Sequence, residues 1–100
     1  MGYALTVYAM AKITDTLGEF DLKKMFQGKS ADSTQKRAEV MAALSEGYAM
    51  KQKAETGEAC EKQEVEYFLS LDPESFAAEF NLAMKAIASG LKREIKAKKQ

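Results

Sequence analysis

The stretch DPESFAAEFNLAMKAIASGLKREIKAKK, residues 72–99, has the clearest pattern in the chain and decides the predicted fold. Asp72 followed by Pro73 is typical of a helix start, because the Asp side chain accepts hydrogen bonds from free backbone N–H groups and Pro has no N–H to leave unsatisfied. Apolar residues then recur every three or four positions, as one face of a helix requires: Phe76, Phe80, Ala83, Met84, Ile87, Leu91 and Ile95. The spacing predicts a helix over residues 73–98 whose apolar face other parts of the chain must cover.

A second helical pattern fills the middle of the chain. Apolar or small residues are again spaced by three or four positions: Val40, Ala43, Gly47, Met50 and Ala54. Small residues in such a stripe favour the close approach of a neighbouring helix. Residues 51–64 are nearly all polar and contain Gly57. Two alternatives stay open: one helix over residues 33–71, about 58 Å long at 1.5 Å per residue, or two helices separated near Gly57.

The beginning of the chain is apolar on all sides. The stretch GYALTVYAMA, residues 2–11, has one polar aliphatic side chain, Thr6. Its alternation would suit a strand, and its steps of three or four residues would suit a helix. We favour a helix over residues 3–26 with a kink near Gly18, because no second strand follows to pair with the first. An element that is apolar all round has to be buried or docked on another chain.

Together these patterns predict a single all-α domain of 100 residues. We expect an up-down bundle of three helices, or of four if the middle helix is interrupted; an uninterrupted middle helix would make the bundle elongated. No run approaches the roughly 20 apolar residues of a membrane span. We also expect no cleavable signal peptide, and the single Cys60 excludes an internal disulfide. The predicted location is the cytoplasm or an assembled particle.

The residue types needed for most catalysis are missing. The chain has no His and one Cys, which removes the commonest general base, the usual zinc ligand and every Cys–His pair. It also has no Gly-rich phosphate loop, and its acidic groups lack the spacing of a calcium loop. We therefore predict that the protein is not an enzyme and has no catalytic, cofactor-binding or metal site.

Charges of opposite sign gather in two separate segments. Residues 55–66 carry five Glu against one Lys, and residues 92–99 carry five basic residues against one Glu. In a hairpin that turns at Asp72 these segments lie at different levels, since each residue advances the helix by about 1.5 Å. We therefore expect them to meet between molecules. The residues predicted for this electrostatic contact are Glu58, Glu61, Glu64, Lys92, Arg93, Lys96, Lys98 and Lys99.

These patterns predict a non-catalytic structural protein that docks through apolar helix faces on copies of itself or on a larger complex, such as a virion or a secretion apparatus. Its interface residues are predicted to be Tyr3, Val7, Met10 and Leu82, because large apolar anchors carry most interface energy and Leu82 falls outside the main stripe. Two alternatives stay open. One is a small inhibitor or adaptor of a single protein, and the other is a nucleic-acid accessory protein that uses the basic tail, although the net charge is zero.

Overall fold

The computed structural model describes residues 2–18, 31–59 and 61–99, with the backbone alone for residues 31, 32 and 92–99. This part of the chain contains helices and no strand, which confirms the predicted all-α bundle. The helices are α1 (Val7–Leu17), α3 (Ala31–Thr56), α4 (Val65–Leu69) and α5 (Pro73–Lys99). Within the same residues, none of the helices has the length and the apolar character needed to cross a membrane.

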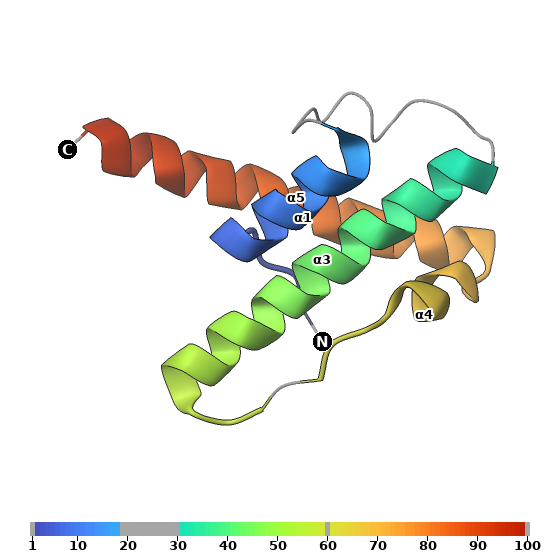
Figure 1. Cartoon of the computed structure of the whole chain (residues 1–100), viewed down its shortest axis with the longest axis horizontal. Coiled ribbons are helices and arrows are strands. Elements are labelled where there is room, and N and C mark those ends of the chain that lie inside the picture. Colours follow the sequence, from blue (N-terminus) through green and yellow to red (C-terminus); the bar gives the residue numbers. More distant parts are fainter. Residues whose placement is uncertain (1, 19–30, 60, 100) are drawn as a thin grey trace.

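The central helix is α3. The helices α1, α4 and α5 all contact it, and Figure 1 shows α3 crossing the long α5 helix. With 26 and 27 residues, α3 and α5 are each about 40 Å long, which matches the 41 Å longest dimension of the molecule. Each of these described helices contributes to the buried apolar core, which includes Ala9, Ile13, Ala38, Val40, Met41, Ala43, Leu44, Phe68, Phe80, Ala83 and Ile87.

The predicted start of α5 is confirmed. The backbone N–H of Ser75 donates to Asp72 Oδ2 at 3.2 Å, and that of Phe76 donates to the Asp72 carbonyl at 2.9 Å. The hydrogen bonds from Ser75 hold the pKa of the Asp72 carboxyl below its ordinary value. Three members of the predicted stripe, Phe80, Ala83 and Ile87, are buried, whereas the side chain of Ile95 lies outside the described part.

The middle of the chain forms two helices. The helix α3 begins at Ala31, two residues before the predicted start, and ends at Thr56. It is followed by Gly57 with a φ of 77°, a left-handed conformation that glycine adopts without strain. Residues 61–64 are not helical, and the backbone N–H of Gln63 donates to the buried Ser45 Oγ of α3 at 2.9 Å. The chain therefore folds back along α3 before α4 begins, which excludes one helix over residues 33–71.

The predicted helix from residue 3 is shorter than expected. Residues 2–6 are not helical, and α1 begins at Val7 because Thr6 is its N-cap: the Thr6 hydroxyl oxygen accepts from the Ala9 backbone N–H at 3.1 Å. At Gly18 the helix ends, where φ is 82°, so this glycine stops α1 and does not kink it. The rest of the predicted helix, residues 19–26, lies outside the described residues, as does Cys60.

The N-terminal segment, residues 2–6, lies between α3 and α5. A Cβ atom added to Gly47 of α3 would come within 2.8 Å of the Ala4 carbonyl oxygen. A Cβ atom added to Gly90 of α5 would come within 2.7 Å of Leu5 Cβ. Both long helices therefore carry a glycine where the segment crosses them. The stripe containing Gly47, which the sequence pattern assigned to a helix–helix contact, lies against both α1 and the non-helical segment: a Cβ atom at Gly47 would also come within 3.3 Å of Ala9 Cβ.

Hydrogen bonds join the N-terminal segment to both long helices. The Ala4 backbone N–H donates to the Leu44 carbonyl of α3 at 3.1 Å. The Tyr3 hydroxyl donates to Glu79 Oε1 of α5 at 2.5 Å, and the Tyr3 ring centroid lies 6.3 Å from that of Phe68. Burial, followed by this hydrogen bond, raises the pKa of Tyr3 far above its ordinary value. The N-terminal segment of this apolar stretch is therefore packed against other parts of the same chain.

The close contact at Gly47 gives a first prediction. Gly47→Ala should lower the free energy of unfolding by about 1–3 kcal/mol, because the new methyl group would overlap a backbone carbonyl that cannot rotate away. Helix propensity alone predicts the opposite sign, a gain of about 1 kcal/mol for Gly→Ala in a helix. Urea denaturation measures the difference. Lys53→Ala, an exposed change on the same helix, is the control and should stay within about 0.5 kcal/mol. A stabilised Gly47→Ala variant would contradict the close contact.

The hydrogen bond of Tyr3 gives a second prediction. Tyr3→Phe should lower the free energy of unfolding by about 1 kcal/mol at pH 7, because the half-buried Glu79 loses its donor. The pKa of Tyr3 is higher in the folded state than in the unfolded state, so its contribution is complete below pH 10 and is lost as the pH rises further. The advantage of the wild type over Tyr3→Phe should therefore shrink by about 1 kcal/mol per pH unit above pH 10, a one-proton slope reduced by partial exposure.

Denaturation of both proteins at pH 7, 10 and 11 measures this convergence. Lysines titrate in the same pH range, but they are the same in the wild type and in Tyr3→Phe. Their contribution to the free energy of unfolding therefore cancels when the two proteins are compared. Tyr67→Phe, which removes an exposed hydroxyl of the same kind, is the control and should change the free energy of unfolding little at any of these pH values. A difference between wild type and Tyr3→Phe that is constant from pH 7 to 11 would rule out the described bond.

Candidate functional site

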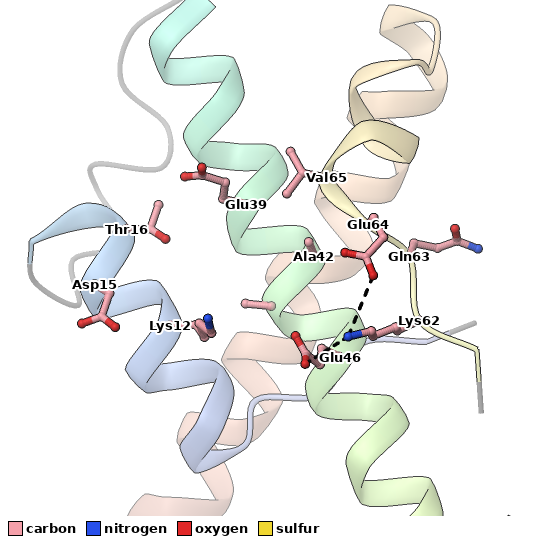
Figure 2. Close-up of a pocket in the computed structure, with 11 residues that line it drawn as sticks. Lys12, Asp15, Thr16, Glu39, Ala42, Glu46, Lys62, Gln63, Glu64 and Val65 are labelled. Carbon is pink, nitrogen blue, oxygen red and sulfur yellow. Dashed lines mark hydrogen bonds and ion pairs between the residues drawn. The ribbon is translucent and has the colours of Figure 1, made fainter. Parts of the chain in front are cut away.

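A hollow in the described surface lies along α3. It is an open groove of about 540 Å³, and Figure 2 shows its lining side chains coming from α3, from α1 and from the segment that leads into α4, with Val65 as the first residue of α4. We call it the α1–α3 groove. It is lined by Lys12, Asp15 and Thr16 of α1, by Glu39, Ala42, Ala43 and Glu46 of α3, and by Lys62, Gln63, Glu64 and Val65.

Local sequence explains why this groove is open. On α1 the buried residues are Ala9 and Ile13, so Lys12 and Asp15, which flank that face, are left at the edge of the contact with α3. The floor contains Ala42 and Ala43, and these short side chains leave space above the α3 backbone. The opposite wall, residues 62–65, is fixed in place by the hydrogen bond to Ser45. The groove is therefore a product of packing between three separate parts of the chain.

A bridging lysine connects two carboxylates at one end of the groove. Lys62 Nζ lies 3.2 Å from Glu46 Oε1 and 3.9 Å from Glu64 Oε1, and Figure 2 marks both contacts. The hydrogen bond with Glu46 raises the pKa of Lys62. All three side chains are partly exposed, so each pair adds little to stability. Their effect is to hold the wall of the groove in register with α3.

The remaining charges leave the groove acidic. Its lining carries four carboxylates and two amines, a formal net charge of −2 since 2 − 4 = −2. Glu39 accepts a hydrogen bond from Gln35 Nε2 at 3.4 Å, and Asp15 pairs with no base in the described part of the chain. Lys12 Nζ lies 5.7 Å from the centre of the Tyr8 ring, within reach of a cation–π contact. These carboxylates can accept charge-assisted hydrogen bonds from a cationic surface.

Among the described residues, no group of three His, Cys, Asp or Glu side chains is arranged to hold a metal ion. The carboxylates of the groove are instead spread along two turns of α3 and across both walls. An elongated surface with separated charges suits contact with another macromolecular surface better than the enclosure of a small molecule, which usually fills an apolar concave pocket.

The four predicted interface residues differ in how exposed their side chains are. Val7 is 86% exposed in the first turn of α1, and Leu82 is 49% exposed in the middle of α5. Met10 is half-buried. Tyr3 is half-buried as well, and both its ring and its hydroxyl have partners within the chain. Val7 and Leu82 therefore remain available as apolar contacts, whereas Tyr3 serves the fold.

Sequence reasoning missed three exposed apolar residues. Met50 belongs to the apolar stripe of the middle helix, yet it is 49% exposed, and Tyr67 and Leu69 of α4 are also exposed. Met50 lies beyond Gly47, where the neighbouring sequence turns polar, and this change in composition is the signal that could have placed it outside the core. In α4 only five residues are helical and Phe68 alone is buried, so the flanking residues Tyr67 and Leu69 point outward.

The structure places the predicted electrostatic residues in different regions. Glu64 lines the α1–α3 groove, whereas Glu58 and Glu61 lie exposed on the stretch after α3. Figure 1 shows the C-terminal end of α5 at the upper left of the view and this stretch at the bottom. The side chains of the predicted basic residues, Lys92, Arg93, Lys96, Lys98 and Lys99, lie outside the described part. The pairing of the two charged segments stays a prediction.

No protein-family model, curated protein or solved structure matches this chain. Its function therefore has to be inferred from its own surfaces.

Proposed function

We propose that the protein is a non-catalytic subunit that associates with copies of itself or with a larger protein complex through its helix faces. The observation that carries this proposal is the exposure of Val7, whose side chain is 86% accessible. Fully burying a side chain of this size stabilises a protein by roughly 1.5–3 kcal/mol. The fold does not bury Val7, so a neighbouring subunit that covered this side chain would gain the free energy of its burial.

The distribution of the other exposed apolar residues supports assembly over the capture of a single partner. Leu82 lies on α5, Met50 on α3, and Tyr67 and Leu69 on α4. An inhibitor or adaptor of one protein would concentrate its anchors in one patch, as hot spots cluster near the centre of an interface. Anchors spread over four helices suit a subunit that contacts more than one neighbour, as in a particle or a secretion-type complex.

Sequence composition supports the non-catalytic part of the proposal. The absence of His from the whole chain removes the side chain that most often transfers protons near neutral pH. Zero net charge likewise gives no global field to attract nucleic acid, so protein is the favoured partner. The location in the cytoplasm or in an assembled particle belongs to the same proposal.

Substitution of the exposed anchors gives a third prediction. Wild-type protein should form oligomers as its concentration rises, and Val7→Asp and Leu82→Asp should each weaken this association at least tenfold, because a carboxylate at the centre of an apolar contact loses its hydration. Sedimentation velocity over a wide concentration range measures the association.

Matched controls place the same charge on the helix that carries each anchor. Thr14→Asp adds it to an exposed position of α1, and Asn81→Asp adds it next to Leu82 on α5; both should associate as the wild type does. Circular dichroism confirms that all variants fold. A wild-type protein that is monomeric at every concentration, with Val7→Asp and Leu82→Asp indistinguishable from it, would contradict association between copies.

A further inference from the structure

The α1–α3 groove and the end of α5 are complementary in charge. The groove carries four carboxylates against two amines, whereas residues 92–99 carry five basic residues against one Glu, a formal charge of +4 since 5 − 1 = +4. Complementary charges across an interface raise the rate of encounter and fix its register. A groove of net charge −2 would therefore favour this helix end over the other helix ends of the chain.

The two surfaces also agree in length. The carboxylates of the groove on α3 run from Glu39 to Glu46, which is about 10 Å along the helix axis. Residues 92–99 form the last part of α5, and eight residues of helix are about 12 Å long. Two turns of one helix would thus lie along two turns of the other.

The path of α5 leads away from the groove of its own chain (Figure 1). The helix continues without a break to Lys99, and Figure 1 shows its end extending past α1, away from the part of α3 that carries Glu39 and Glu46. A straight helix cannot turn back to reach a groove on its own chain. The groove of another copy has no such restriction.

We propose that the α1–α3 groove of one copy receives the C-terminal end of α5, residues 92–99, from a second copy. This inference rests on the proposed association between copies and names one of its contacts. The contact is heterologous, since it joins two different surfaces, so a pair of copies would still have one groove and one helix end that the contact has not used. Association would therefore continue beyond a dimer, or close into a ring, and would weaken as ionic strength rises.

Charge reversal of each surface tests the contact in the full-length protein. The groove variant carries Asp15→Lys and Glu39→Lys, and the tail variant carries Lys96→Glu and Lys99→Glu. Each should associate with itself at least tenfold more weakly than the wild type in sedimentation velocity. An equimolar mixture should associate more strongly than either variant alone, because the unchanged tail of the groove variant fits the unchanged groove of the tail variant.

The control adds the same net charge outside the groove and outside both charged segments. Glu74→Lys, Ala54→Lys and Ala88→Lys change three exposed residues of α3 and α5. Together they raise the net charge by four, as the groove variant does, and should leave association unchanged. Loss in this control equal to that in the groove variant would overturn the assignment to the groove, because it would show an effect of net charge alone.

The remaining outcomes separate this inference from the proposed function. If Val7→Asp and Leu82→Asp weaken association while both charge reversals do not, the groove contact is wrong and apolar docking stands. If the reversals weaken association and their mixture restores it, while the apolar substitutions have no effect, the groove contact stands and apolar docking is wrong. A mixture that associates no better than its components would overturn the groove contact.

Discussion

The constraint on which the structure depends is the insertion of residues 2–6 between the two long helices. At Gly47 and at Gly90 the segment lies so close to α3 and α5 that a Cβ atom would overlap it. The segment fills the space between these helices, and it also fixes where Thr6 can cap α1. Because α1 then packs on α3, the same five residues determine where the α1 wall of the α1–α3 groove stands.

How much of this could be predicted depends on how local the decisive interactions are. The start of α5 was predictable because Asp72 bonds to residues three and four positions away. The state of residues 2–6 was not, since Tyr3 is held by Glu79, 76 positions along the chain, and the apolar pattern suited a helix equally well. Gly47 did indicate a close approach, but a glycine in a stripe does not specify whether a helix or an extended segment approaches.

The groove was harder to predict than the fold, because no single stretch of sequence contains it. Lys12, Glu46 and Glu64 each look like an ordinary solvated charge in their own helix or loop. They acquire a common environment only when the backbone of Gln63 bonds to the buried Ser45 and returns the chain along α3. Sequence did indicate that residues 55–66 are acidic, but of the three Glu selected there, one, Glu64, lines the groove.

The two kinds of exposed surface would contribute differently to association. Exposed apolar side chains such as Val7 and Leu82 provide free energy when they are covered, but the hydrophobic effect has no direction, and scattered apolar contacts do not fix an orientation. Partly exposed charges are individually weak, yet their pattern fixes register. A protein with zero net charge has no net long-range repulsion between copies. Local charge patterns are then free to select which faces meet, and an acidic groove with a basic helix end would supply that selection where apolar anchors alone would not.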